Sequence, residues 1–595
     1  MPPNPNKLSQ FWQELKRRKV VRVITVFSAA AFVILELVSI IVEPLELPEW
    51  TLPMIIVLLC IGFIIAIILS WIYDIHPEEG IVKTEPAYKA KEKDKPVTSN
   101  SWKIASYISF VVIVGLIVLN IIPRTSKKEI LEKSIAVLPF EDMSSQQDQE
   151  YFCDGMAEEI INSLTQLDSL KVIARTSTFA FKDKHQDIRE IGRILDVRTV
   201  LEGSVQKSGN RLRITAQLIN VEDGSHLWSE RYDRDMQDIF IIQDEISQAI
   251  VDKLKIKLFG KQSATSGHRQ TENLEAYNLY LKGRFFWHRR TEEDLLKSMD
   301  FYQQALELDS TYALAYAGLA DVYFIMTWWG YYPKEEGFEK GKTYVSKALS
   351  INDKLAEVHA TLGGILTWYD WDWKGAEKEL LYAISLNPND ANAYQYYSEL
   401  LKILGKSKEA REYIDQAIKL NPHSRIMYNL SASYYYREGA YEKAIEECKK
   451  SLEIAQFGWP MLRFFNCYIK LGMNVEAKEQ LKKIVSFDPS LNSPEVIDSI
   501  YLESGTEGLI RWLIHWLQTN ETPDFYYNLN LNYRIAGLYA FIGDSEHAME
   551  YLEKSFETGE TKVPNMKFSP IFDLIRHDPR FEAMLKKMDL YTTTQ

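Results

Sequence analysis

Two clusters of aromatic residues with nearby carboxylates are the side chains best suited to hold a ligand. They are the run WWGYY at 328–332 and the run WYDWDW at 368–373. Aromatic faces and carboxylate oxygens can line a pocket for a peptide, a sugar or a lipid headgroup. The alternative is that the rings only pack neighbouring turns against each other. The candidate contact residues are Trp328, Trp329, Tyr331, Tyr332, Trp368, Asp370, Trp371 and Asp372.

Residues suited to catalysis form no recognisable pattern. There is no phosphate-binding G-x-x-x-x-G-K-[ST] loop, no H-E-x-x-H zinc helix and no G-x-S-x-G nucleophile elbow, and the ten histidines lack ligand spacing. We therefore predict no enzyme activity, no cofactor and no metal. An enzyme hidden in the middle of the chain is an alternative, since charged residues adjoin apolar strands there. They are Arg175, Glu202, Arg213, Glu230, Arg231 and Asp233.

The elements that would position the aromatic clusters are helical repeats. Glycine, alanine and proline recur about every 34 residues, a period typical of the tetratricopeptide repeat (TPR). Such helix pairs stack into a superhelical solenoid with a concave binding surface. We predict an array over 274–560 and a capping segment over 561–595. The repeating positions are Gly405, Gly439 and Gly472, then Ala410, Ala444 and Ala477, and Pro388, Pro422 and Pro489.

A small α/β domain is predicted ahead of the repeats, over residues 134–260. SIAVLPF at 134–140 has the apolar composition of a buried strand, and 150–167 has the spacing of an amphipathic helix. LKVIART suggests a second strand and DIREIGRILD a second helix. Three strand-like runs follow, divided by Gly209-Asn210 and Asp223-Gly224, before a last amphipathic helix.

This segment resembles the TolB-amino-terminal-like domain. The resemblance is carried by SIAVLPFEDMS, YFCDGMAEEIINSL, VIARTSTFAFK, LDVRTVLEGSVQKSGNRLRITAQLI and HLWSERYDR. It implies a sensory or periplasmic-type module placed ahead of TPRs. Members often join this pair to a winged-helix DNA-binding domain or a nucleotide cyclase domain, and we expect neither here.

Three apolar runs near the start have the length of membrane spans. They cover residues 20–42, 52–73 and 105–122, and about 20 apolar residues cross a bilayer. Lysine and arginine gather in 1–19 and between the second and third runs, so both segments are expected to be cytoplasmic. The prediction is a bacterial inner-membrane, multi-pass protein with a cytoplasmic N-terminus and periplasmic soluble domains. Glu36 could be a functional intramembrane carboxylate, or it could reach toward the headgroups.

The net charge argues against one class of partner, and the cysteine count argues against a disulfide-stabilised fold. The formal net charge is −13 and most of the acidic excess lies after residue 133, which argues against nucleic-acid binding. Four cysteines do not make a disulfide framework.

The sequence thus predicts a multidomain chain: three transmembrane helices, a small α/β domain, then an all-α TPR superhelical solenoid. Its predicted function is that of a non-catalytic, membrane-anchored scaffold or sensor that binds a protein or peptide partner through the solenoid. The alternative is a transmembrane signalling component that regulates a cytoplasmic cyclase or transcription output. The sequence predicts neither the identity of the partner nor an oligomeric state.

Overall fold

The computed structural model describes residues 20–42, 51–76, 80–83, 133–167, 169–184, 186–254, 271–454, 458–486, 495–519 and 530–591. The chain divides into two compact units, residues 1–128 and 129–595. Each is described separately.

The first unit contains a pair of helices and a β-hairpin. Helix α2 spans Val20–Val42 and α3 spans Thr51–Ile72, and strands β1 (Tyr73–His76) and β2 (Gly80–Lys83) pair in antiparallel register. The rings of Phe27 and Phe63 lie 5.5 Å apart between the helices. A Cβ at Gly62 would lie 3.3 Å from Phe27, so this glycine permits the close approach.

The prediction of transmembrane helices is wrong for the residues that the structure describes. Among them, no helix combines the length and the apolar character needed to cross a bilayer. The third expected span, 105–122, lies outside the described residues. The three-helix anchor and the multi-pass inner-membrane localisation are therefore corrected.

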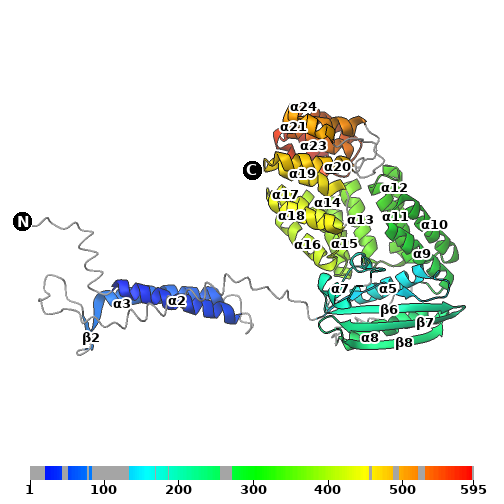
Figure 1. The fold of residues 1–595 in the computed structure, drawn as a ribbon, viewed down its shortest axis with the longest axis horizontal. Helices are drawn as coiled ribbons and strands as arrows, with labels where there is room; N and C mark the ends of the chain where they lie inside the picture. The colour runs from blue at the N-terminus through cyan, green and yellow to red at the C-terminus, as the bar shows by residue number, and fades with distance from the viewer. Residues whose placement is uncertain are drawn as a thin grey trace, which may run out of the picture. The chain divides into compact units, whose positions relative to one another are not determined.

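The second unit begins with a mixed sheet flanked by helices on both faces (Figure 1). The strand order is β5-β3-β6-β7-β8, with β4 also paired to β6. Strand β3 is parallel to β5 and β6, whereas β6, β7 and β8 form an antiparallel meander. The strands are β3 (Ser134–Val137), β4 (Glu141–Asp142), β5 (Lys171–Val172), β6 (Thr199–Ser208), β7 (Arg211–Asn220) and β8 (His226–Asp235).

Apolar residues on both faces of this sheet explain its two helical layers. One face packs with α5 (Glu150–Thr165) and α8 (Ile239–Lys253) in a core that continues into the repeats. The other face packs α7 (Ile188–Ile194) in a smaller core around Val200 and Leu195, and the short helix α6 (Arg175–Phe179) follows β5. The predicted second strand is shorter than expected, because α6 begins already at Arg175.

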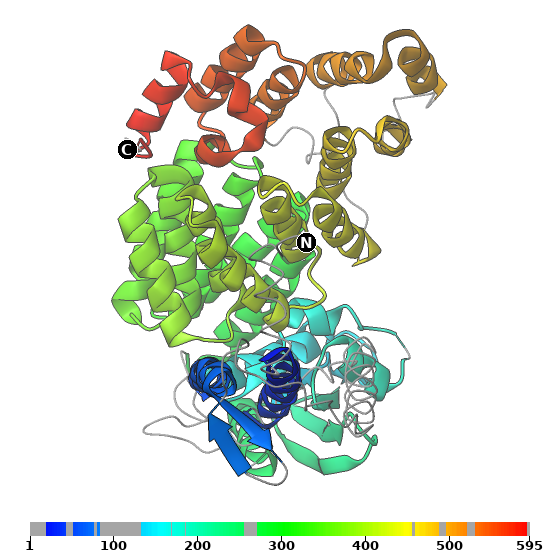
Figure 2. The same ribbon diagram turned by 90° about the vertical axis from the view of Figure 1, so that its left-hand side faces the viewer.

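The rest of the second unit is a stack of helix pairs (Figure 2). In the central pairs a glycine with positive φ links the two helices: Gly405, Gly439 and Gly472 have φ of 83°, 75° and 71°, a conformation that glycine adopts without strain. The α-helices are α9 (Leu274–Arg289), α10 (Glu292–Leu308), α11 (Ala313–Trp328), α12 (Lys334–Ile351), α13 (Ala356–Ile365), α14 (Trp373–Leu386), α15 (Ala391–Ile403), α16 (Ser407–Leu420), α17 (Arg425–Arg437), α18 (Tyr441–Ile454), α19 (Gly458–Lys470), α20 (Asn474–Ser486), α21 (Glu495–Thr519), α23 (Leu531–Phe541) and α24 (Ser545–Glu557).

The C-terminal segment returns to the middle of the array. It contains η4 (Val563–Phe568), η5 (Pro570–Ile575) and α25 (Pro579–Lys587). Its apolar residues share a core with α14, α15 and α16, and the indole of Trp373 donates a 2.8 Å hydrogen bond to the carbonyl of Met588. In Figure 2 these orange and red elements lie beside the mid-array helices. The domain boundaries, including a cap over 561–595, stay a prediction.

A buried tyrosine joins the first two repeats through two glycines. The side chain of Tyr302 is fully buried, and a Cβ at Gly283 of α9 or Gly318 of α11 would lie within 2.4 or 2.5 Å of its ring. We expect Gly283→Ala to reduce the free energy of unfolding by about 1–3 kcal/mol, because overpacking outweighs alanine's helix propensity. Urea denaturation checks this. Adding Tyr302→Leu should recover part of the loss, and a variant as stable as wild type would contradict the packing argument.

Candidate binding cavity

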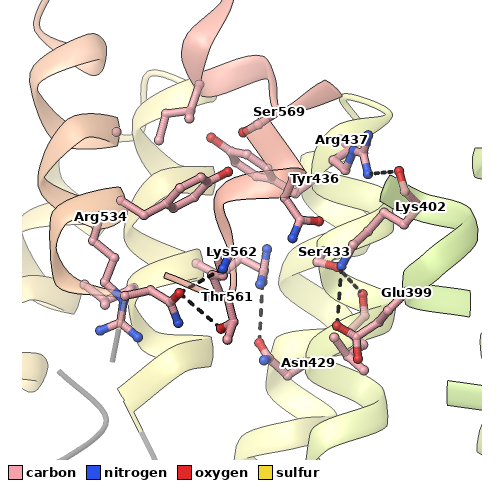
Figure 3. Close-up of a pocket in the computed structure, with 18 of the residues that line it drawn as sticks. Glu399, Lys402, Asn429, Ser433, Tyr436, Arg437, Arg534, Thr561, Lys562 and Ser569 are labelled. Carbon is pink, nitrogen blue, oxygen red and sulfur yellow. Dashed lines mark hydrogen bonds and ion pairs between the residues drawn. The ribbon is translucent and has the colours of Figure 1, made fainter. Parts of the chain in front are cut away.

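A cavity of about 250 Å³, lined by both polar and apolar side chains, lies among the repeats of the second unit (Figure 3). Helices α15, α17 and α19 form one wall, and α23 with the 561–571 segment forms the other. The cavity exists because the C-terminal segment folds back toward the middle repeats. The lining residues are Trp328, Trp368, Gln395, Glu399, Lys402, Ile426, Asn429, Leu430, Ser433, Tyr436, Arg437, Leu462, Arg463, Asn466, Leu517, Asn530, Tyr533, Arg534, Gly537, Leu538, Thr561, Lys562, Asn565, Ser569 and Ile571.

Repetition places equivalent side chains in the cavity. Gln395, Asn429 and Arg463 are each one repeat apart on the first helices α15, α17 and α19. Arg463 Nε lies 3.5 Å from Asn429 Oδ1, so adjacent repeats touch through these side chains. Polar side chains at this position do not contribute to the apolar core of a repeat. They lie on the surface with which such repeats bind ligands.

The lining is strongly cationic. Five of its residues are basic, and Glu399 is the only acidic one among the described lining residues. Glu399 Oε1 accepts a hydrogen bond from Gln395 at 3.3 Å, and its other oxygen lies 4.0 Å from Lys402 Nζ. The basic residues are Lys402, Arg437, Arg463, Arg534 and Lys562.

Burial and mutual repulsion act on these cations. Burial, together with the charges of Arg437 and Arg463, lowers the pKa of Lys402 to about 8, although Glu399 opposes the change. Burial also lowers the pKa of Lys562 well below its ordinary value, aided by Arg534 and Arg463. Both shifts reflect the cost of burying positive charge beside other positive charges.

Two of the predicted aromatic contacts lie at this cavity. Trp328 and Trp368 both line it, and their ring centroids are 5.6 Å apart. Trp368 belongs to a π-helical turn, η3 (Leu366–Asp370). One side chain from each aromatic run thus lies beside the other. Their role as ligand contacts stays a prediction.

The other six candidate contacts have structural partners in the described part of the chain and do not line the cavity. Tyr332 packs edge-on against Tyr323, and Trp329 against Tyr331. Trp371 contacts Phe556, Asp370 pairs with Lys342 at 3.0 Å, and Asp372 caps α14 by accepting from the N–H of Gly375. Sequence spacing alone could not separate these packing roles from ligand contact.

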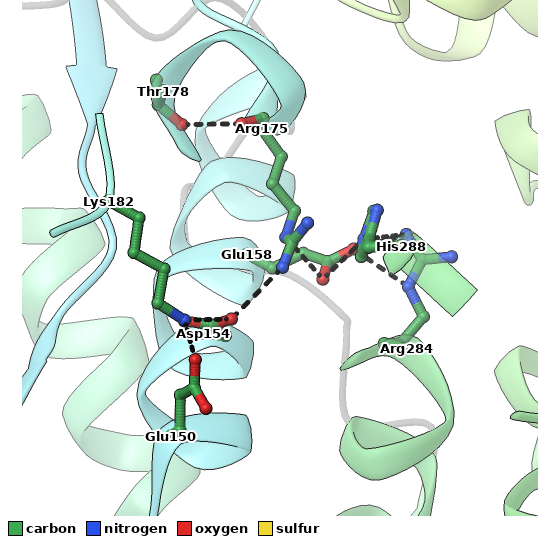
Figure 4. A network of polar contacts seen from close by, with 8 residues as sticks. All are labelled: Glu150, Asp154, Glu158, Arg175, Thr178, Lys182, Arg284 and His288. Carbon is green, nitrogen blue, oxygen red and sulfur yellow. Dashed lines mark hydrogen bonds and ion pairs between the residues drawn. The ribbon is translucent and has the colours of Figure 1, made fainter. Parts of the chain in front are cut away.

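A second polar cluster joins the α/β domain to the first repeat (Figure 4). Glu158 of α5 is buried between Arg284 and His288 of α9, with Arg284 Nε at 2.9 Å and His288 Nε2 at 3.2 Å from its Oε1. Arg175 Nε lies 3.3 Å from the other oxygen. Asp154, one turn earlier, pairs with Lys182 at 2.7 Å.

The ionisation of this cluster is fixed by its charges. Burial would raise the pKa of Glu158, but the charge of Arg284 and the hydrogen bond with His288 outweigh burial and hold that pKa well below its ordinary value. Burial, reinforced by Arg175, lowers the pKa of His288 well below its ordinary value, so the imidazole is neutral near pH 7. An ionised carboxylate with committed partners is an ion pair that joins two elements, not a general base.

The ends of two repeats also bind the α/β domain. Asn389 accepts from the N–H of Val172 at 3.1 Å and donates to the carbonyl of Thr165 at 3.1 Å. Ser177 donates to Asn421 Oδ1 at 2.5 Å and accepts from the N–H of His423 at 2.8 Å. The motifs SLNPND and KLNPHS thus end a repeat and attach the sheet domain as well. A single sequence gave no sign of this second use.

The residues considered for a hidden enzyme do not form one site. Asp233 makes surface pairs with Arg211 and Arg213 at 2.8 and 2.9 Å, whereas Arg175 lies in the buried cluster. Glu230 accepts a 3.2 Å hydrogen bond from the indole of Trp228. Within the described ranges, no group of three or more His, Cys, Asp or Glu side chains could hold a metal ion.

Comparison with known protein families identifies the repeats and the domain ahead of them. Residues 379–412, 425–457 and 529–558 match tetratricopeptide repeat models. Residues 131–249 match the second domain of HilA/YgeH-like transcriptional regulators. The chain therefore carries TPRs, repeats that form protein-binding scaffolds. The matched family model does not support the TolB resemblance, which stays a prediction.

Curated relatives cover part of the chain. It is 39% identical over 238 residues to "Putative adenylate cyclase 3" of Rhizobium meliloti, covering 40% of each protein. It is 24% identical over 297 residues to the transcriptional regulator HilA of Salmonella paratyphi A, covering 49% of this chain and 51% of HilA. The chain thus spans about half or less of the length of these relatives.

Solved structures add only distant likenesses. A Pseudomonas aeruginosa PilF structure is 19% identical, with 39% of this chain and 98% of that chain covered and a TM-score of 0.30. A tetratricopeptide repeat protein from Parabacteroides merdae is 15% identical, with 51% and 98% covered and a TM-score of 0.30. We draw no functional conclusion from either.

Proposed function

We propose that this protein is a non-catalytic scaffold that holds a segment of a protein partner in the cavity of its repeat superhelix. The observation that carries the proposal is the alignment of Gln395, Asn429 and Arg463 along one wall of that cavity. Side chains repeated along a concave surface contact successive residues of an extended peptide. The absence of the common catalytic motifs and the net charge of −13 support a protein partner over a reaction or a nucleic acid.

The α/β domain and the C-terminal segment have supporting roles in this proposal. Glu158 and Asn389 fix the sheet domain to the array, and the 561–571 segment encloses the cavity. Both attachments stiffen the superhelix before a partner arrives, which reduces the entropy lost on binding. Trp328 and Trp368 extend the surface toward earlier repeats.

Site-specific crosslinking tests the proposal. With p-benzoylphenylalanine at Leu430, which lines the cavity, we expect an adduct that maps to one short segment of one partner. The same amino acid at Leu296, which is 49% exposed on α10, is the matched control and should give no such adduct. Equal yields from both positions, or adducts scattered over many surfaces, would contradict a specific site in the cavity.

A signalling role is the second candidate. It is favoured by the match of residues 131–249 to a transcriptional-regulator domain and by the similarity to a protein named as an adenylate cyclase. In this version the partner is itself a cyclase or a transcription regulator. Mass-spectrometric identification of the Leu430 adduct distinguishes it: a structural protein as the partner would exclude the signalling version.

A further inference from the structure

Strand β8 forms an open edge of the sheet (Figure 1). It stands at the end of the strand order, and among the described residues it pairs on one side only, with β7. About half of its backbone N–H and C=O groups therefore point away from the sheet. At ten residues, His226–Asp235, it is longer than most strands. An edge of this length is a template for a further strand unless its side chains prevent pairing.

Charged side chains of both signs follow this edge. Glu230, Arg231 and Arg234 are exposed, and none of them has an ion pair with another described residue. Glu230 accepts only from neutral groups, including the indole of Trp228 at 3.2 Å. Arg234 donates to the backbone carbonyl of Asp233 at 3.4 Å. The three charges on the edge are therefore available to another molecule.

A second copy of β8 can add to this edge only in certain registers. Side chains that face each other in an antiparallel pair lie on the same side of the sheet, so in a symmetric dimer one residue must face its own copy. Registers centred on Glu230, Arg231 or Asp233 place like charges directly opposite each other, which is destabilising. A register centred on Ser229 gives Glu230 no facing cation.

Centring the register on Tyr232 places opposite charges together. Glu230 then faces Arg234 of the second copy. Arg231 faces Asp233 of the second copy, and symmetry repeats each pair. Opposite charges that face each other across two strands stabilise their pairing. The edge thus has the charge pattern of a self-complementary strand.

The two kinds of pair differ in strength. Asp233 already pairs with Arg211 and Arg213 of its own sheet at 2.8 and 2.9 Å, so a further arginine adds little there. Glu230 and Arg234 have no such partners among the described residues and gain their first ionic contact. This pair therefore selects the register.

We propose that β8 pairs with β8 of a second copy in the register centred on Tyr232, so that one sheet continues across a symmetric dimer. Backbone hydrogen bonds supply the attraction, and the charge pairs select the register. The contact covers residues 229–235 of each copy, fewer than the about 20–30 residues a side of a stable interface, so the dimer should dissociate on dilution. No described residue of β8 lines the cavity, so this inference is independent of the proposed function.

Sedimentation equilibrium of the full chain tests the pair of Glu230 and Arg234. We expect wild type to dimerise with a dissociation constant below about 100 μM. Glu230→Arg places two arginines opposite each other and should raise this constant at least about fivefold. Glu230→Arg/Arg234→Glu exchanges the charges and should return it to within about twofold of wild type. Both variants lose the acceptor of the Trp228 indole, so only the charge pairing separates them.

A matched control separates strand pairing from net charge. Glu293→Arg makes the same change of charge at a side chain that is 80% exposed on α10, and its dissociation constant should stay within about twofold of wild type. An equal loss in Glu293→Arg, no loss in Glu230→Arg, or a double variant as weak as Glu230→Arg would overturn the proposal. A wild type that stays monomeric at about 100 μM would overturn it as well, and would mean that the charged edge blocks pairing.

Disulfide trapping tests the register. In the proposed register Ser229 faces Asp235 of the second copy, whereas the two copies of Ser229 lie about 20 Å apart along the strands. Cys60, the exposed native cysteine, is changed to serine throughout. Ser229→Cys/Asp235→Cys should form a disulfide-linked dimer under mild oxidation, and Ser229→Cys alone should not. Equal yields from the two variants would overturn the register, and circular dichroism should show both folded.

Discussion

Glu158→Gln is expected to reduce the free energy of unfolding of the second unit by about 3–5 kcal/mol at neutral pH. The change keeps the side chain's shape and removes its charge. Arg284, whose Nε lies 2.9 Å from Glu158, would then be buried without its carboxylate, and Arg175 would keep only Asp154 at 3.6 Å. Breaking one side of a buried pair costs far more than deleting an exposed one. Urea denaturation of the full chain, followed by tryptophan fluorescence, measures the loss.

An exposed glutamate provides the matched control. Glu293, whose side chain is 80% exposed, pairs with Lys297 at 2.6 Å, and Glu293→Gln should cost no more than about 0.5 kcal/mol. The Glu293 pair is exposed and has a lysine partner, whereas Glu158 is buried among two arginines and a histidine. A Glu158→Gln variant as stable as Glu293→Gln would contradict the view that this cluster joins the sheet domain to the repeats.

The interactions of Glu158 also determine how the stability of the folded protein changes with pH. The pKa of Glu158 is held well below its ordinary value by Arg284 and His288, against the effect of burial. The folded protein therefore binds fewer protons than the unfolded chain, and this stabilisation is complete above the ordinary carboxyl pKa, about 4.3. It is lost as the pH falls through the folded-state pKa. Glu158→Gln should lack this part of the acid sensitivity.

The repeats and the sheet domain follow from local sequence patterns. Gly405, Gly439 and Gly472 recur at turns that require positive φ, so a backbone requirement is visible in one sequence. Likewise the helix predicted over 150–167 is present as α5, because its apolar residues recur with the period of an α-helix. Such patterns depend only on neighbours in the chain.

The cavity could not be predicted in the same way. It is formed when the 561–571 segment folds back on helices more than a hundred residues earlier, and no local pattern encodes that return. Arg463 and Asn429 occupy equivalent positions in successive repeats, and this repetition is the one sequence feature that could have indicated the cavity. A polar residue at that position is, however, equally compatible with a solvent-exposed helix face. The aromatic runs were more visible, yet only Trp328 and Trp368 reach the cavity.

Glu159 is buried like its neighbour Glu158, but the positive charge around it is not enough to keep its carboxyl group ionised. Burial, reinforced by the charge of Glu158, raises the pKa of Glu159 to about 8, although Arg284 lowers it. The folded protein thus keeps a proton that the unfolded chain releases near pH 4.3. Stability declines as the pH rises through this window and levels off above about pH 8.

Glu159→Gln should therefore act in the opposite direction to Glu158→Gln. Glutamine resembles the protonated carboxyl group and cannot ionise, so we expect the variant to be more stable than wild type by about 4–5 kcal/mol at pH 8 and nearly equal to it at pH 4.5. Urea denaturation at both pH values measures the difference. If Glu159→Gln destabilised the protein equally at both, Glu159 would be ionised when folded, and the low-dielectric junction between α5 and α9 would need a different account.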